Sequence, residues 1–431
     1  MRFLGIGECA DLADLYLRLV AHGHEVKIFI GYPLCRDTLV GLIQRVADWR
    51  TELDWIRAAG PDGCVLFENI GLGYGEIQDR LRRDGFNVIG GGAYGTRLEN
   101  DRAYAQDVLA DLGLATAPTF EFSDVEEARR FIERRPARYV LKSNGPDAAS
   151  FVGRHKAGAD VQAVLAAGGK IAASSFVLME FVEGVEMGVG AYFNGEDFLE
   201  PACLDWEHKR FFPGDLGELT GEMGTVVTYS RSKRFFDRTL AKMVPLLRAN
   251  GYCGYINLNT TVNEAGIWPL EFTCRFGYPG YAILDPLQKT PWADLFRAML
   301  TRSTLMFDTE PGFAVGIVIT TPPFPYYRDT LPAPVGLPVL FDGDLSSAEL
   351  RHIHYGEVAF QNGVLVTSGA SGYTLVVTGT GETIEAARNA ANALADKVVV
   401  ANARYRRDIG TRLIEGEFAR VEAIGLLDPQ L

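Results

Sequence analysis

Short apolar strands alternate with amphipathic helices over the first hundred residues, and this alternation constrains the fold more than any other feature. Strands are predicted at 2–7, 26–30, 63–67 and 87–90, with helices at 10–22, 39–58 and 76–84. Strands joined by helices in this way form a parallel sheet that binds ligands at the carboxyl ends of its strands. The Gly5–x–Gly7 turn lacks the third glycine of a dinucleotide fingerprint, so it only weakly indicates NAD.

The later part of the chain also shows clear local patterns. Helices are predicted at 98–114 and 232–250. Strands are predicted at 364–369 and 373–379, and we expect these two strands to form a hairpin.

Length, charge and cysteine spacing limit the class of protein. The chain has 431 residues, too many for one ordinary core, so we expect several subdomains. A net charge of −13 argues against a general nucleic-acid surface, although a nucleotide needs only a few local cations. The six cysteines form no CxxC pair, which disfavours zinc and disulfide frameworks. With no signal peptide and no apolar run of membrane length, we expect a cytoplasmic protein that does not enter the membrane.

Two predicted strands near residue 260 place oxygen-bearing side chains together. Glu271 and Thr273 share one face of the second strand, because they alternate with apolar residues. Asn257 and Asn259 share one face of the first strand, and turn residues at 263–266 join the two strands into a hairpin. Hard oxygen ligands of this kind suit magnesium held together with phosphates.

A second interpretation of this hairpin explains the same residues equally well. A buried carboxylate needs either a metal or a cationic partner, because an unpaired buried charge is too costly. Glu271 could therefore pair with Arg275, four residues further along the chain, in a hairpin that binds nothing.

Three further charged segments are candidates for ligand binding. Lys142 ends a predicted strand, where its flexible side chain can reach phosphate oxygens. Residues 180–186 place glutamates beside a strand edge, an arrangement suited to adenine and ribose. Residues 207–210, Glu-His-Lys-Arg, precede a glycine-rich loop at 214–224 that can hold an anion. Taken singly, each segment is also typical of solvated surface charge.

The order of these segments along the chain is more specific than any one of them. It resembles the ATP-grasp superfamily and, more closely, the glycinamide ribonucleotide synthetases, or phosphoribosylamine–glycine ligases. Residues 98–104 resemble the family's LEGSKAF, 179–186 its EEFLDGEE, 207–210 its DHKR, 220–224 its TGGMG and 270–277 its IEFNCRFG, while 366–369 and 405–410 resemble its C-terminal domain.

The resemblance implies a multidomain α/β and α+β fold in which two ATP-grasp lobes hold ATP. The expected parts are an N-terminal doubly wound domain on the substrate side (1–97), lobe A (98–182), lobe B with the metal site (183–310) and a small mixed C-terminal domain (311–431).

The resemblance also implies an ATP-dependent carboxylate–amine ligase of purine biosynthesis. In such an enzyme ATP phosphorylates a carboxylate, and an amine then displaces phosphate to form an amide. The implied cofactors are ATP and Mg²⁺, with Mn²⁺ as an alternative, and the metal neutralises phosphate charge. The implied substrates are a small carboxylate, either glycine or another amino acid, and an amine. The expected protein is a monomer or a homodimer.

Carried over position by position, the resemblance assigns roles to nine residues. Lys142 and Lys209 would contact phosphates, Glu180 and the Val182 backbone would bind adenine, Glu186 would bind ribose, Glu271 with Asn257 and Thr273 would hold magnesium, and Arg275 would steady the transferred group. Lys209 and Arg275 are therefore the expected catalytic residues, and Arg275 suits its role because its planar fork binds phosphate or carboxylate.

The chain also departs from the family's motifs. Thr273 replaces an asparagine, and Asn257 stands where many ATP-grasp enzymes carry another metal ligand. Tyr278 and Gly280 replace two acids, and the loop after Lys142 lacks the family's second lysine. The N-terminal segments carry acids in place of an arginine, which suggests a different or less anionic amine substrate.

Three interpretations therefore stay open. The first is a working ligase that acts on phosphoribosylamine or on a changed substrate. The second is an ATP-binding but catalytically weak relative with a regulatory or interaction role. The third is a binding module that takes no nucleotide. The retained charges favour the ligase, because a decayed site has no reason to hold them together.

Overall fold

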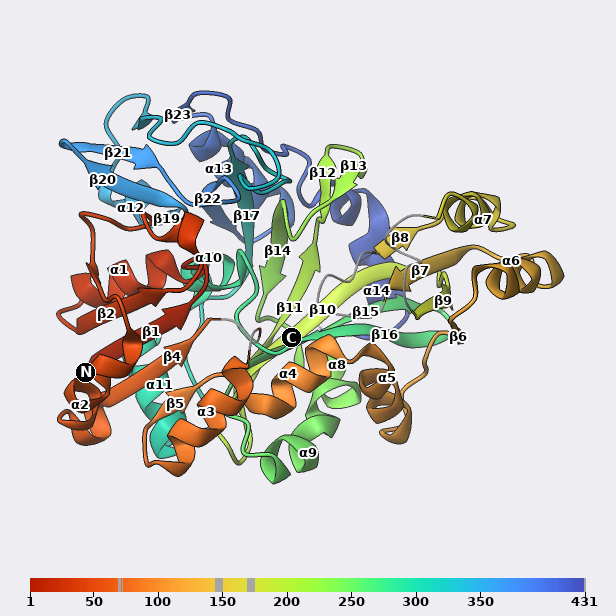
Figure 1. Ribbon diagram of the computed structural model, residues 1–431, viewed down its shortest axis with the longest axis horizontal. Helices are drawn as coiled ribbons and strands as arrows, with labels where there is room; N and C mark the ends of the chain where they lie inside the picture. The colour runs from red at the N-terminus through yellow and green to blue at the C-terminus, as the bar shows by residue number, and fades with distance from the viewer. Residues whose placement is uncertain (69–70, 72, 144–149, 169–174, 430–431) are drawn as a thin grey trace. The chain divides into compact units, whose positions relative to one another are not determined.

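The computed structural model describes residues 1–431 except 69–70, 72, 144–149, 169–174 and 430–431 (Figure 1). The described chain forms two compact units. The larger unit contains Met1–Thr96, Met187–Asn257 and Thr273–Leu431, and the smaller unit contains Arg97–Glu186 and Leu258–Phe272. The four-part division expected from the sequence stays a prediction. No helix in the described part of the chain is long and apolar enough to cross a membrane.

The larger unit begins with the predicted parallel sheet. Its strand order is β3-β2-β1-β4-β5, and every pair is parallel. The strands are β1 (Arg2–Gly7), β2 (Glu25–Ile30), β3 (Gln44–Arg45), β4 (Gly63–Phe67) and β5 (Val88–Ile89), and the longest helices between them are α1 (Ala13–Ala21) and α3 (Tyr74–Arg83). Phe3 lies in one hydrophobic cluster, while Leu4 and Ile6 lie in another. Both faces of the sheet are therefore covered, as in a doubly wound fold.

The single helix predicted at 39–58 is wrong. This segment contains β3, a 3₁₀ turn at Trp49–Glu52 and the short helix α2 (Leu53–Arg57). Gly41 has a φ of +76°, a left-handed conformation that a continuous helix does not allow. The Asp48 side chain accepts a hydrogen bond from the Arg50 N–H and starts the 3₁₀ turn.

An eight-stranded sheet forms the rest of the framework, in the order β16-β15-β10-β11-β14-β17-β22-β19. Its strands are β10 (Val185–Phe193), β11 (Phe198–Glu207), β14 (Gly224–Thr228), β15 (Gly254–Asn263), β16 (Gly266–Thr273), β17 (Phe313–Thr320), β19 (Ile353–Tyr355) and β22 (Tyr373–Gly381). Helix α13 (Ile384–Ala395) packs on β22, where Gly379 and Gly381 leave no room for a side chain. The β15–β16 neighbours confirm the predicted hairpin, whose turn is closed by Asn263 Oδ1 accepting from the Ala265 N–H (2.9 Å).

The hairpin predicted between 364–369 and 373–379 is wrong. Strand β21 (Val364–Thr367) pairs with β20 (Val358–Gln361), whereas β22 pairs with β17 and β19. The buried carboxylate of Glu357 accepts hydrogen bonds from the N–H groups of 370–372, and these bonds hold the connection away from a two-strand turn.

Two predicted helices are broken in the structure. The predicted helix at 98–114 is divided into α4 (Gly92–Asn100) and α5 (Arg102–Asp111), because the Asp101 side chain caps α5 through the Tyr104 N–H. The predicted helix at 232–250 is divided at Thr239 into α8 (Lys233–Arg238), a 3₁₀ turn and α9 (Val244–Ala249). The Thr239 hydroxyl donates to the Phe235 carbonyl, and its φ and ψ of −127° and −97° are not helical.

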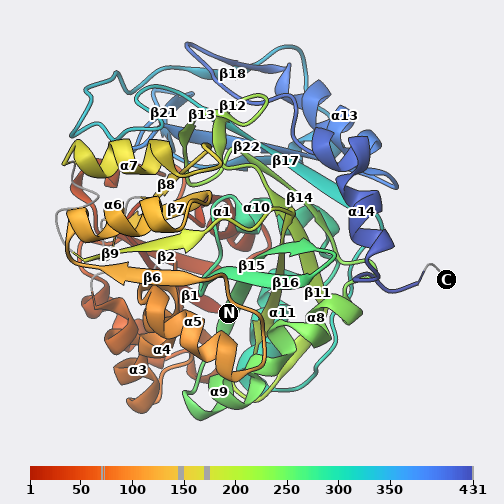
Figure 2. The ribbon, with the colours of Figure 1, turned by 90° about the vertical axis from the view of Figure 1, so that its right-hand side faces the viewer.

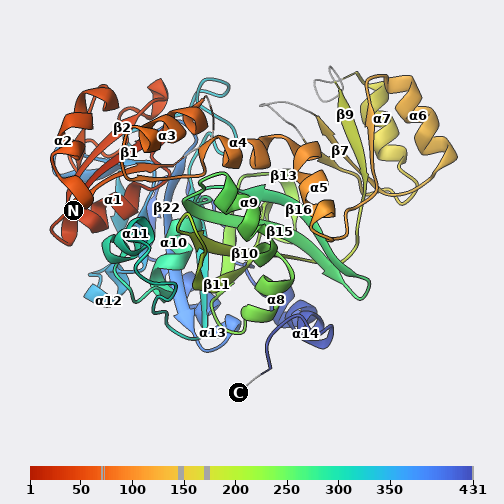
Figure 3. The same ribbon diagram turned by 90° about the horizontal axis from the view of Figure 1, so that it is seen from below.

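The smaller unit is built on an antiparallel sheet in the order β6-β9-β7-β8. Its strands are β6 (Thr119–Phe122), β7 (Tyr139–Ser143), β8 (Ser150–Val152) and β9 (Phe176–Glu180). Helices α6 (Val125–Arg134) and α7 (Ala159–Ala166) lie side by side on one face of this sheet, as Figure 2 and Figure 3 show. They bury Tyr139, Leu141 and Leu178 on that face.

Candidate functional site

Lys142 lies on the face of the smaller sheet that turns away from α6 and α7. It pairs with Val177 across β7 and β9, whereas Tyr139 pairs with Glu180. Positions 139 and 142 are an odd number of residues apart, so Lys142 and Val177 point to the face opposite Tyr139. Lys142 is only 8% exposed, so its side chain is largely covered, and it brings one positive charge to this face of the sheet.

The predicted adenine and ribose residues follow at the end of β9. The Glu180 carboxylate lies 2.7 Å from Arg135 Nε, so its side chain is engaged on the helix side of the sheet. Val182 is half-buried in the linker that follows. Glu186 is exposed on β10 between the buried residues Val185 and Met187, so its carboxylate points toward solvent. The Glu186 side chain is therefore exposed, while the Glu180 side chain is engaged with Arg135.

Glu271 belongs to the smaller unit. Its Oε2 lies 3.9 Å from Arg102 Nη1, and its side chain is 37% exposed. It is therefore accessible to a cation supplied with a nucleotide. Arg275 belongs to the larger unit, where it is half-buried and its Nη1 donates to the Phe276 carbonyl (3.4 Å).

A pocket within the larger unit joins several predicted residues to others that sequence reasoning missed. Asn257 and Thr273 line it, as predicted for residues of one site. Three carboxylates line the same pocket: Asp205 and Glu207 on β11, and Glu222 just before β14. The other wall is the segment Gly277–Gly280, including Tyr278. We call this the acidic pocket.

Asn257 and Asp205 form one hydrogen-bonded pair in the acidic pocket. Asn257 Nδ2 donates to Asp205 Oδ2 at 2.5 Å, and both side chains are buried. Gly190 on β10 makes this arrangement possible, because a Cβ there would lie 1.8 Å from the Tyr255 hydroxyl and 3.1 Å from Asn257 Nδ2. Burial, with the nearby charge of Glu207, raises the pKa of Asp205 to about 8.

Glu222 is held in the acidic pocket by the backbone. Its Oε1 accepts hydrogen bonds from the N–H groups of His208 (2.9 Å), Met223 (3.1 Å) and Gly224 (3.0 Å), and the residue is 1% exposed. Burial and the Glu207 charge raise its pKa well above the usual range. A glutamate in the segment that resembles TGGMG was the available sequence signal for this residue.

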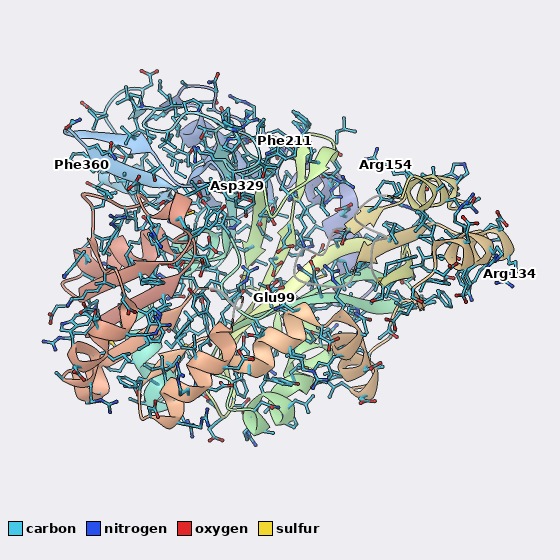
Figure 4. The ribbon with its side chains drawn as sticks, in the orientation of Figure 1. Glu99, Arg134, Arg154, Phe211, Asp329 and Phe360 are labelled. Atoms are coloured by element: carbon cyan, nitrogen blue, oxygen red, sulfur yellow. The ribbon has the colours of Figure 1, made fainter. Side chains whose placement is uncertain are left out.

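Lys209 lies beside the acidic pocket, because its side chain pairs with Glu207, which lines that pocket. Its Nζ is 2.9 Å from Glu207 Oε2. Its neighbour His208 is buried, with Nδ1 against the Trp206 carbonyl (3.2 Å) and Nε2 accepting from the Gly410 N–H (3.1 Å). Phe211, labelled in Figure 4, follows on β12 (Arg210–Phe212) and packs against Phe324. The 207–210 segment is therefore anchored on both sides of Lys209.

A magnesium site requires several hard oxygen donors close together. Within the described ranges, no group of three or more His, Cys, Asp or Glu side chains is arranged to hold a metal. The amide oxygen of Asn257 is buried with no hydrogen-bond partner among the described residues. Within the larger unit, the Asn257 amide oxygen and the Thr273 hydroxyl are hard donors that fit magnesium only when phosphates supply the remaining ligands.

Comparisons with known proteins bear on the class of this chain. Residues 100–281 match the family model described as "Phosphoribosylglycinamide synthetase, ATP-grasp (A) domain". A phosphoribosylamine–glycine ligase of Pseudomonas aeruginosa is 27% identical over 402 residues, which cover 89% of each chain. The crystal structure of a phosphoribosylamine–glycine ligase from Thermotoga maritima has a TM-score of 0.72 at 22% identity, covering 95% of this chain and 100% of that one.

A more distant structure adds a nucleotide complex. The biotin carboxylase domain of the Hydrogenobacter thermophilus 2-oxoglutarate carboxylase, solved with ADP, its magnesium salt and bicarbonate, has a TM-score of 0.63 at 11% identity. It covers 93% of this chain, and this chain covers 91% of it, a likeness that establishes the fold alone.

The fold and these comparisons together indicate the class: residues 100–281 match an ATP-grasp domain, and the chain shares the fold of a solved phosphoribosylamine–glycine ligase. Within that class it is similar to the phosphoribosylamine–glycine ligases, as its motifs predict. These likenesses support the predicted enzyme, an ATP-dependent ligase that forms a C–N bond.

Proposed function

We propose that this chain is a carboxylate–amine ligase that forms an amide through an acyl phosphate, with a substrate pair that differs from phosphoribosylamine and glycine in at least the amine. In the first step the γ-phosphoryl group moves from ATP to a carboxylate oxygen of the acid, and its bond to ADP breaks. In the second step the amine nitrogen attacks the carbonyl carbon and the C–O bond to phosphate breaks. The amide, inorganic phosphate and one proton are the products.

One observation carries this proposal. Three segments far apart in the sequence, at 205–209, 257 and 273, converge on the acidic pocket within the larger unit. Two of the residues expected to handle magnesium line it, and the expected phosphate-binding Lys209 is paired with its wall residue Glu207. A chain that kept only the fold would have no need to gather these charges, because burying them without a ligand is costly.

The described residues have distinct tasks in this mechanism. Lys142 binds the nucleotide phosphates from the smaller sheet, and the 180–186 segment binds the nucleoside. Lys209 and Arg275 steady the transferred phosphoryl group and the carboxylate, because they carry charges that match both. Magnesium, when bound with ATP, neutralises phosphate charge during transfer. Glu271, Asn257 and Thr273 are the residues that would hold it.

A coupled ADP-release assay tests the proposal. The full chain is incubated with Mg-ATP and pairs drawn from a panel of amino acids and amines that includes glycine and fresh phosphoribosylamine. ADP that depends on both members of a new pair supports the proposal, whereas ADP that requires glycine and phosphoribosylamine contradicts the changed amine. Thermal stabilisation by Mg-ATP without ADP from any pair favours the ATP-binding regulatory relative instead.

A further inference from the structure

The acidic pocket contains three buried acceptor oxygens that the protein does not satisfy. Asp205 Oδ1, Glu222 Oε2 and Asn257 Oδ1 have no hydrogen-bond partner among the described residues. The three side chains are 5%, 1% and 8% exposed, so bulk water does not serve these atoms. Buried acceptors without donors are unfavourable, and a group of them in one cavity indicates a missing donor.

The rest of each side chain is fixed, so the unsatisfied oxygens have a defined direction. Glu222 Oε1 is held by three backbone N–H groups and Asp205 Oδ2 by Asn257. Only the second oxygen of each carboxylate is left to meet a ligand. Both oxygens belong to residues that line the same pocket.

The charge around this pocket is also unbalanced. The pocket contains three carboxyl groups, those of Asp205, Glu207 and Glu222. Lys209 lies next to them and pairs with Glu207. The opposite wall carries the phenol of Tyr278, whose oxygen is buried with no partner among the residues that the structure describes, and Gly280. Neither residue brings a positive charge to the pocket.

A primary ammonium group matches these requirements. It carries three N–H donors and one positive charge, so it can donate to both Asp205 Oδ1 and Glu222 Oε2, while Asn257 Oδ1 stays with the proposed magnesium. Burial raises the pKa of both carboxyl groups, so their ionised form needs a positive charge beside it, which a water molecule does not bring. A phosphate group would be repelled here, because it would bring further negative charge next to buried acids.

We propose that the acidic pocket binds the ammonium group of a phosphate-free primary amine, which Glu222 and Asp205 hold as the amine substrate of this ligase. That this amine is a substrate rests on the proposed function, but its binding does not require turnover. The pocket offers no donor set for a phosphate, and we therefore expect a phosphate-free amine to be preferred over phosphoribosylamine.

Calorimetry on the full chain tests the binding. The probes are ethanolamine and putrescine, with choline as a matched cation that has no N–H donor, ribose 5-phosphate as a phosphate probe and Mg²⁺ alone. We expect the two primary amines to bind and the other three probes to give no signal that depends on Glu222. Absence of binding by both primary amines would overturn the proposal.

Two variants keep the fold while removing the charge. Glu222→Gln retains an oxygen for the three backbone donors, and Asp205→Asn retains an acceptor for Asn257. Each is expected to weaken amine binding about tenfold to a hundredfold, the loss of one charge-assisted hydrogen bond. The exposed Glu415→Gln is the matched control and should bind amines like the wild type. Unchanged affinity in Glu222→Gln, or an Mg²⁺ signal lost in that variant, would refute the ammonium assignment.

The ADP assay separates this proposal from the ligase proposal. Amine binding that depends on Glu222 but yields no ADP with any acid would leave the ammonium site standing and remove the ligase. ADP formation with phosphoribosylamine that is unchanged in Glu222→Gln would leave a ligase and overturn the ammonium site.

Discussion

The buried guanidinium of Arg406 holds the loop after Lys209 against the C-terminal segment, and replacing it with leucine should destabilise the larger unit. Arg406 is 1% exposed. It donates to both oxygens of Asp408 (2.8 and 2.7 Å), to Asp215 Oδ1 (3.0 Å) and to the Arg210 carbonyl (3.0 Å). Removing one partner from a buried ion pair typically costs about 3–5 kcal/mol, because the remaining charge is left uncompensated.

The expected loss lies at the lower end of that range. Asp408 keeps the Gly214 N–H (2.9 Å), and Asp215 keeps Arg412 (2.9 Å), so neither carboxylate is stranded. We therefore expect Arg406→Leu to lower the free energy of unfolding by about 3 kcal/mol. The measurement is urea denaturation followed by tryptophan fluorescence. When the free energy of unfolding depends on urea concentration with the same slope in both proteins, the shift in the midpoint reports the change in stability.

The neighbouring Arg407 provides a matched control. It also pairs with a carboxylate, Asp396, but its side chain is 60% exposed. Solvent screens such a pair, so Arg407→Leu should cost at most about 1 kcal/mol. Equal losses in the two variants would refute the reasoning, because burial would then have no effect on the value of the ion pair.

Three further predictions follow from the sites described above. Glu271→Gln should abolish ADP release. The melting temperature should change little, because the Glu271 side chain is 37% exposed. Turnover near the wild-type rate would remove Glu271 from the proposed magnesium ligands. Lys142→Ala should weaken ATP binding by roughly 1.5–3 kcal/mol, the value of a charge-assisted hydrogen bond, and unchanged affinity by calorimetry would exclude Lys142. Burial lowers the pKa of His208 to about 4, so the unfolded state binds a proton first as pH falls. The stability that neutral His208 contributes is complete above about pH 6.5. The free energy of unfolding should fall by about 3 kcal/mol on acidification to pH 4. Urea denaturation at several pH values should show a shallower decline in His208→Gln, and parallel profiles for the two proteins would contradict this.

The parallel sheet could be predicted because its signal is local. Each strand of the N-terminal region is a short apolar run followed by a helix, and right-handed crossovers leave few other arrangements. The helix predicted at 39–58 failed where the signal depends on single residues. Gly41 in a left-handed conformation and the capping Asp48 override a pattern of apolar spacing.

The hairpin of β21 and β22 failed for a different reason. Both segments have strand patterns, and the sequence correctly marks them as strands. Their pairing is decided by the buried Glu357, whose carboxylate binds the backbone between them, and by β17, which is far away in the sequence. Strand identity is a local property, whereas pairing depends on partners that local patterns do not name.

The acidic pocket shows the same limit at the level of function. Asn257 and Thr273 could be proposed as site residues because the sequence alone shows both their strand pattern and their positions in the motifs. Asp205 lies in the buried part of β11, at 202–206, where nothing in its neighbours marks it as special. It becomes a functional candidate only when β11 and β15 bring it within 2.5 Å of Asn257.

Glu222 shows why the pocket requires a ligand rather than a structural explanation alone. Its Oε1 already binds three backbone N–H groups, and a neutral glutamine could do this equally well. The second oxygen adds nothing to that structural task. Burial and the Glu207 charge raise the pKa of this carboxyl group well above its usual range, so its ionised form is costly without a cation. A structural role alone would therefore be indifferent to Glu222→Gln, whereas a cation-binding role would not. The comparison of that variant with wild type, in stability and in amine affinity, separates the two roles of one side chain.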